Sequence, residues 1–226
     1  MSHPVSLVDQ KRAAIIAGFS LLTMALLAPI AFFVVLEPIQ TAGDTAAQIS
    51  AMQAAGTLFR VSILIFFIVA VLDLVLAWAL HGVFSPANPH LSLLAAWFRL
   101  VYTAVLLVAT VALVEVQSLL QAPAPDSTHW QLLLQHQFNG FFSAFYFGLG
   151  VFGCHLIVLG YLIIRTNLFP SLLGALVVIA GLGYLIDTLG KVMISHYGLG
   201  LASFTFVGEV LLIGWLFWWG FRRVAH

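Results

Sequence analysis

Ionisable side chains are scarce in this sequence, and several of them stand inside long apolar stretches. Asp73, Arg99 and His155 are three such groups. A charged residue at the centre of a membrane helix costs about 2.5–3.5 kcal/mol on insertion scales, so such residues face the bundle interior and have partners or a function. The chemistry that the sequence offers is therefore charge pairing, proton transfer or cation binding inside a membrane.

An inner group of polar residues is expected where three consecutive helices meet. Asp73, Arg99 and His155 each lie roughly 10–17 Å from one end of their helices, at 1.5 Å per residue, so we expect their side chains to make contact. Tyr102 stands one turn from Arg99. Two interpretations stay open: an Asp–Arg pair that only fixes helix packing, or a site where His155 senses pH or relays a proton.

An outer group of polar residues is expected near the opposite helix ends, around an outward-facing pocket. Asp187 and Lys191 are four residues apart, which places them on one helix face. Glu209 has no cation near it on its own helix and is too short to reach the headgroups, so we expect it to face the pocket. The full outer group is Arg60, Glu115, His136, Asn139, Asp187, Lys191 and Glu209.

Four functions are compatible with these groups. The first is a pocket that binds a lipophilic or small cationic molecule through the outer group. The second is a small proton-coupled carrier in which Glu209 or Asp73 titrates. The third is a membrane enzyme with zinc on His136, Asp187 and Glu209, although the sequence has no H-E-x-x-H motif. The fourth is a structural or accessory subunit. No motif predicts a cofactor or a resident metal ion.

Six membrane-spanning helices are expected to position these groups. Apolar residues make up 62% of the chain and charged residues 7%, against about 25% charged in a soluble protein, so lipid must be the main solvent. The net charge of +0 gives no reason to expect nucleic acid as a partner. About 20 apolar residues cross a bilayer as a helix. We therefore expect an all-α bundle, one integral membrane domain over residues 1–226, with spans Ala13–Leu36, Leu58–Phe84, Leu91–Gln117, Phe138–Ile164, Leu168–Gly190 and Leu201–Phe221.

The orientation follows from the basic residues beside the helix ends. Cytoplasmic loops carry an excess of Lys and Arg. With six spans, the flanking cations fall on one side, which predicts that both termini are cytoplasmic and that the protein lies in the inner (plasma) membrane. We expect the first span to be retained rather than cleaved as a signal peptide. Tryptophans near the end of the last span are expected to anchor it at the interface. The cations are Lys11, Arg12, Arg165, Arg222 and Arg223, and the tryptophans are Trp215, Trp218 and Trp219.

Glycines in the predicted spans indicate close helix packing. Residues 148–153 spell G-x-G-x-x-G, but a dinucleotide site needs a strand before that motif, and here it lies inside a predicted membrane helix. Small residues let membrane helices approach closely. The positions expected to do so are Gly140, Ala144 and Gly148 in the fourth span and Gly174 and Gly181 in the fifth.

Several segments resemble an uncharacterised bacterial membrane-protein family, catalogued as domain of unknown function 4386. They are QKRAAIIAGFSLLTMALLAPIA at Gln10–Ala31, HLIVLGYLIIRTNLFPSLLGALVVIAGLGYLIDTLG at His155–Gly190, and GEVLLIGWL at Gly208–Leu216. Arg99 also fits the family pattern, whereas Tyr102 stands where the family has a glutamate. The resemblance implies a six-helix bacterial inner-membrane protein and brings no established activity.

Overall fold

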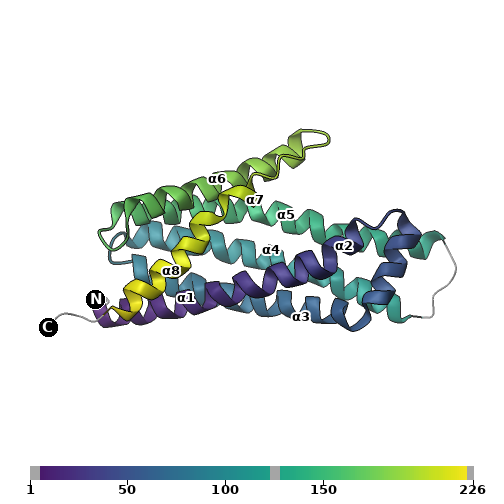
Figure 1. Ribbon diagram of the computed structural model, residues 1–226, viewed down its shortest axis with the longest axis horizontal. Coiled ribbons are helices and arrows are strands. Elements are labelled where there is room, and N and C mark those ends of the chain that lie inside the picture. Colours follow the sequence, from purple (N-terminus) through teal and green to yellow (C-terminus); the bar gives the residue numbers. More distant parts are fainter. Residues whose placement is uncertain (1–5, 123–127, 223–226) are drawn as a thin grey trace. The chain divides into compact units, whose positions relative to one another are not determined.

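The computed structural model describes residues 6–122 and 128–222, and this part of the chain is helical without strands (Figure 1). The described stretches 7–40, 45–84, 89–121, 128–165, 171–193 and 202–221 are long and apolar enough to cross a membrane. This confirms the all-α fold with six spans. The elements are α1 (Leu7–Pro29), η1 (Ile30–Leu36), α2 (Glu37–Gln40), α3 (Thr45–Phe84), α4 (Pro89–Gln121), α5 (Thr128–Arg165), α6 (Ser171–Met193), α7 (Ala202–Thr205) and α8 (Val207–Phe221).

The first span changes its helical type at Pro29. α1 ends there, and the π-helix η1 takes the chain on from Ile30 to Leu36. Proline has no N–H and its ring crowds the carbonyl group four residues earlier, so the α-helical bonding pattern cannot pass through it unchanged. A wider turn absorbs the misfit.

The second span is preceded by a separate helix on the same element. Within α3, Gly56 has φ 43° and ψ −107°, a conformation that glycine adopts without steric cost. The part of α3 before Gly56, residues 45–55, forms a short helix of its own, which we call the surface helix. The spanning part follows Gly56.

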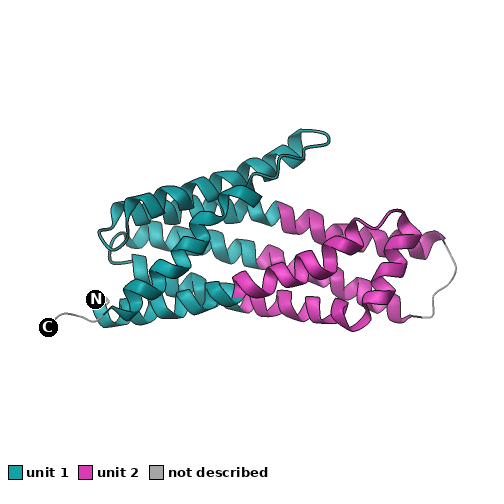
Figure 2. Ribbon diagram, in the orientation of Figure 1, with its two compact units in different colours: residues 1–23, 72–103, 147–226 teal, residues 24–71, 104–146 magenta. Residues whose placement is uncertain are grey.

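The chain forms two compact units, each built from several separate segments of the sequence (Figure 2). Unit 1 contains residues 1–23, 72–103 and 147–226, and unit 2 contains residues 24–71 and 104–146.

Unit 2 has an aromatic core with a polar contact at its surface helix. Rings pack between α3 and α5, with Phe59 against Phe138 and Phe66 against Phe141. Gln135 donates to Gln48 Oε1 at 3.2 Å, which attaches the surface helix to α5.

The predicted basic side is one end of unit 1. Lys11 Nζ donates to the carbonyl oxygen of Arg222, so the start of α1 meets the end of α8. The end of α3 joins them, because Gln10 Nε2 donates to Val83 O at 2.9 Å. Phe169, in the turn after α5, packs on Phe84 and on Trp219. We call this the basic end. Which compartment it faces stays a prediction.

Glycines bring α5, α6 and α8 into close contact. A Cβ atom on Gly153 would lie 2.6 Å from Gly181 O, and one on Gly160 would lie 2.6 Å from Gly174 O. The close approach expected at Gly174 and Gly181 is confirmed, but their partners on α5 are Gly153 and Gly160. At Gly140 an added Cβ would meet nothing within 4 Å, so the expected role of that glycine was wrong.

Candidate functional site

A buried ion pair forms the centre of unit 1. Arg99 on α4 donates through Nε to Asp73 Oδ1 on α3 at 2.7 Å, and its Nη2 lies 2.6 Å from the same oxygen. Both side chains are almost fully buried, at 3% and 0% exposed. Since Arg99 uses only Oδ1, the second oxygen, Oδ2, is buried without a hydrogen-bond partner among the described residues.

His155 on α5 completes the contact expected from the sequence. Its Nε2 lies 3.0 Å from Arg99 Nη1, and its Nδ1 lies 2.8 Å from the carbonyl oxygen of Ala95. A guanidinium group can only donate and a carbonyl group can only accept. His155 is therefore assigned as the neutral imidazole, with the proton on Nδ1. The predicted meeting of Asp73, Arg99 and His155 is present, while its role stays a prediction.

Phe152 packs against the polar groups and shields them. The Arg99 guanidinium carbon lies 5.1 Å from the centre of its ring, at cation–π distance. The rings of Tyr102, His155 and Tyr184 lie 5.1, 5.7 and 5.4 Å from it. Tyr102, one turn from Arg99, thus belongs to this aromatic layer.

Glu209 extends the cluster from α8. The sequence grouped it with the outer residues, but its carboxyl group interacts electrostatically with Arg99 and Asp73 and lies beside the Tyr184 hydroxyl group on α6. Within the described chain its Oε1 is buried without a hydrogen-bond partner. Because Glu209 stands in the first turn of α8, the helix dipole favours its anionic form there. We call Asp73, Arg99, Tyr102, His155, Tyr184 and Glu209 the Arg99 cluster.

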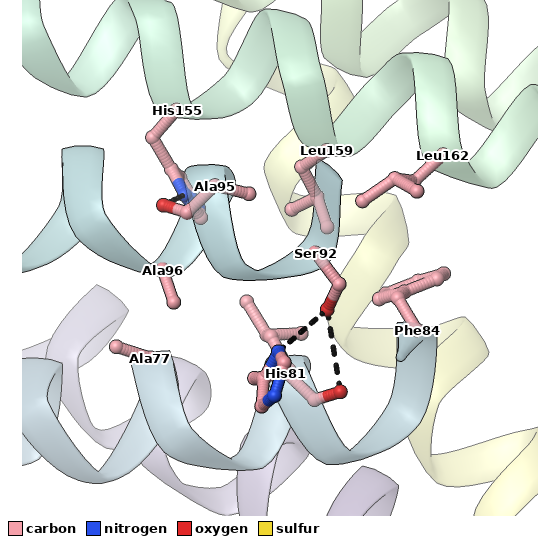
Figure 3. Close-up of a pocket in the computed structure, with 10 residues that line it drawn as sticks. Ala77, His81, Phe84, Ser92, Ala95, Ala96, His155, Leu159 and Leu162 are labelled. Atoms are coloured by element: carbon pink, nitrogen blue, oxygen red, sulfur yellow. Dashed lines mark hydrogen bonds between the residues drawn. The ribbon is translucent and has the colours of Figure 1, made fainter. Parts of the chain in front are cut away.

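Toward the basic end, the cluster is closed by tight packing. A gap bordered by His155, Ala95, His81 and Ser92 has no room for a water molecule. Figure 3 shows the Ser92 hydroxyl group between the His81 ring and the His81 carbonyl group, at 3.0 and 3.3 Å.

Asp187 holds a loop rather than facing an open space. Its carboxylate accepts hydrogen bonds from the Tyr197 hydroxyl group at 2.7 Å and from the N–H groups of Leu201 and Ala202 at 2.9 and 2.8 Å. It therefore fixes the chain that leads from α6 into α7. Lys191, one turn on, interacts with it electrostatically.

The remaining outer residues are exposed in the described chain. Arg60, Glu115, His136 and Asn139 belong to unit 2 and are exposed, and Lys191 in unit 1 is exposed as well. The outward-facing pocket stays a prediction. Among residues 6–122 and 128–222, no three His, Cys, Asp or Glu side chains are placed to hold a metal ion.

Sequence reasoning missed Tyr184 as a member of the cluster and Phe152 as the ring that packs against it. A signal for Tyr184 was present, because it opens the Tyr-Leu-x-Asp motif that ends at Asp187. Gly208 is also marked in the sequence, because it forms a Gly-Glu pair with Glu209 at the start of GEVLLIGWL. A Cβ on Gly208 would lie 2.6 Å from the Leu176 carbonyl group, so the Gly-Glu pair brings α8 against α6 and Glu209 to the level of Tyr184.

Comparisons with known proteins agree with the resemblance seen in the sequence. A family model described as a domain of unknown function (DUF4386) matches residues 16–220. A relative from the archaeon Archaeoglobus fulgidus, described as an uncharacterized protein, is 34% identical over 155 residues, which cover 69% of this chain and 81% of the relative. No solved structure matches the chain.

Proposed function

The chain belongs to the family described as domain of unknown function 4386, and from the Arg99 cluster we propose that it is a small proton-coupled membrane carrier in which Glu209 binds and releases the proton. The observation that carries this proposal is the buried Oε1 atom of Glu209, which has no hydrogen-bond partner in the described chain. A buried carboxylate oxygen without a partner is costly, and a proton removes that cost.

The charges around Glu209 support a reversible proton site. Arg99 is the cation that acts on both carboxylates, and it is already engaged by Asp73 Oδ1. The neutral imidazole of His155 adds no second positive charge. With Glu209 ionised the cluster carries one negative charge in excess, and with Glu209 protonated it is neutral. The bilayer favours the neutral form, whereas Arg99 and the start of α8 favour the anion.

Coupling to transport requires that the cluster changes when the proton binds. Glu209 lies on α8, Tyr184 on α6 and Arg99 on α4. Loss of the Glu209 charge weakens its attraction to Arg99 and leaves Asp73 as the guanidinium partner. The packing of α8 on α6 is the contact that this change would alter.

Infrared difference spectroscopy tests the proton site directly. The purified protein in lipid nanodiscs is compared between acidic and alkaline pH, and a protonated carboxyl group shows a carbonyl band that the carboxylate lacks. Exposed carboxylates also become protonated at acidic pH, so we expect several such bands in the wild type and the loss of one of them in Glu209→Gln. The matched control is Glu115→Gln, an exposed carboxylate, which should keep the band. Survival of every wild-type band in Glu209→Gln would refute the proposal.

A structural or accessory subunit is the second candidate, and the closed Asp73–Arg99–His155 contact favours it. A packing device needs no water and no moving proton, and the gap beside His155 is too small for a water molecule. Under this function Glu209→Gln shows the same infrared difference as the wild type, and its effect is confined to thermal stability.

We also propose that the protein lies in the plasma membrane with its basic end in the cytoplasm. The support is the position of Lys11 and Arg222 at one end of unit 1, together with the rule that cytoplasmic flanks are rich in Lys and Arg.

A further inference from the structure

From the basic end we infer a binding site for one anionic phospholipid of the surrounding leaflet, at the end of α8 and beside α1. An open hollow of about 520 Å³ is lined by Phe217, Trp218, Phe221 and Arg222. Because the hollow is widely open, a phospholipid headgroup and the first part of its chains can reach it from the surrounding leaflet.

The charges at the hollow are positive, and within the described chain they lack a carboxylate partner. Among the described residues, the ion pair at this end joins Arg12 to Asp9 at 3.9 Å. Lys11 donates to the carbonyl oxygen of Arg222, which brings its ammonium group to the end of α8 where the Arg222 side chain begins. Lys11 and Arg222 thus lie at the same helix end, and the described residues supply no carboxylate to either cation. A phosphate group would supply a counter-ion through charge-assisted hydrogen bonds.

The apolar lining fits the rest of a lipid. The Arg222 guanidinium carbon lies 5.0 Å from the Trp218 ring centre, so the cation is held over an aromatic face. Trp218 is 50% exposed and Phe221 62% exposed. The Phe217 ring packs edge-on against Phe19 of α1 at 4.9 Å, which continues the apolar surface away from the charges. A lipid phosphate would bind the Arg222 guanidinium group, and the acyl chains would cover the exposed aromatic rings.

The occupant is a lipid rather than a free phosphate because the hollow pairs charge with aromatic surface. Trp and Tyr side chains mark the level of the headgroups in membrane proteins, and the cytoplasmic leaflet carries anionic lipids that attract basic residues. This inference is independent of the proton site, since none of its residues belongs to the Arg99 cluster.

Lipid titration of the detergent-purified full chain tests the site. We expect phosphatidylglycerol to raise the thermal unfolding midpoint more than phosphatidylcholine with the same chains, and native mass spectrometry to show one retained phosphatidylglycerol. Arg222→Gln should weaken phosphatidylglycerol binding about tenfold, the equivalent of one charge-assisted hydrogen bond. Lys11→Gln is the second variant and should weaken it in the same direction.

The matched control is Arg12→Gln, which removes a cation at the same end that is paired with Asp9 and should keep the lipid preference. Three results would overturn the site: equal binding of the two lipids by the wild type, a preference that survives both Arg222→Gln and Lys11→Gln, or an equal loss in Arg12→Gln. Glycerol phosphate alone serves as a further arm, and full stabilisation by it would replace the lipid with a free phosphate ligand.

Discussion

Asp73 and Arg99 stabilise each other because each removes the cost of burying the other charge. We predict that Asp73→Asn lowers the thermal stability of the purified protein more than the double change Asp73→Asn with Arg99→Gln. Removing one member of a buried pair leaves the other charge without a partner, at about 3–5 kcal/mol, whereas replacing both removes the charges together. Unfolding midpoints in one detergent measure the difference.

Ser62→Ala is a suitable control for these variants. Ser62 is also buried on α3, but its hydroxyl group donates within the helix, to Phe59 O at 2.7 Å. Its loss should change stability by much less than the loss of Asp73. A double variant less stable than Asp73→Asn alone would show that Arg99 has favourable contacts of its own, with His155 and Phe152, that outweigh the unpaired charge.

The contact among Asp73, Arg99 and His155 could be predicted because depth along each helix is readable from the sequence. Groups at one depth in consecutive helices can meet, and their cost in lipid makes them do so. The approach of Glu209 could not be predicted in this way. It depends on which face α8 turns to α6 and on the break at Phe206 between α7 and α8. An estimate of depth from the number of residues assumes one straight helix, so it does not account for this break.

The packing of α8 on α6 depends on Gly208. We predict that Gly208→Ala destabilises the protein by about 1–3 kcal/mol, the usual cost of overpacking. The added Cβ would lie 2.6 Å from both the carbonyl carbon and the oxygen of Leu176 and 2.8 Å from Val177 N. These are backbone atoms, which cannot rotate away, so α8 must shift and carry Glu209 with it. Thermal unfolding in detergent measures the stability, and the infrared band of Glu209 reports the shift.

Gly214→Ala is the matched control on the same helix. A Cβ at Gly214 would meet nothing within 4 Å, and alanine favours a helix over glycine by about 0.5–1 kcal/mol. Gly214→Ala should therefore keep or raise stability. Equal losses in the two variants would contradict the close-approach explanation.

The loop between α6 and α7 is predicted to loosen at alkaline pH. The Tyr197 hydroxyl group donates a hydrogen bond to the Asp187 carboxylate, and this bond raises the pKa of Tyr197 above the ordinary value of 10.0. A raised pKa means that this contact stabilises the fold fully below about pH 10 and that the stabilisation is lost as the pH rises through the raised pKa. Tyrosinate absorbance, as the difference between wild type and Tyr197→Phe, follows the titration.

Asp187→Asn tests the cause of that shift. The amide has no charge to repel a tyrosinate, so the pKa of Tyr197 should return toward its ordinary value. Amide hydrogen exchange at Leu201 and Ala202 should become faster in the same variant, because their N–H groups donate to the Asp187 carboxylate. An unchanged titration of Tyr197 in Asp187→Asn would exclude Asp187 as the cause.

The membrane-spanning helices could be predicted because hydropathy sets their approximate bounds. Local changes of the backbone within these helices could not be predicted. The six spans follow from long apolar runs, which exceed the length needed to cross a bilayer. The π-helix after Pro29 and the break at Gly56 do not change hydropathy at all. Proline and glycine mark such places as permissive, but neighbouring packing decides which local geometry forms.

Composition predicted the class of the whole chain, because so few charged residues cannot cover a water-exposed surface. The division into two units was not predictable from hydropathy, since α3, α4 and α5 each contribute residues to both. Different side chains fill the two interiors, with phenylalanine rings in unit 2 and the Arg99 cluster in unit 1. Every residue singled out by the family resemblance in the last spans, from His155 to Glu209, falls in unit 1.

The distribution of cations predicts how the whole chain is inserted. Lys11, Arg12 and Arg222 stand at the basic end, and Arg165 ends α5 next to the turn that packs there. Each Lys or Arg near an anionic leaflet contributes about 1 kcal/mol, so together they favour one orientation strongly. We predict that a green fluorescent protein fused to the C-terminus is fluorescent and that alkaline phosphatase at the same place is inactive. A fusion after Ala122, between α4 and α5, should give the opposite pair of results, because three candidate spans separate this position from the C-terminus. Active phosphatase at the C-terminus would reverse the orientation and place the lipid site of Arg222 in the outer leaflet.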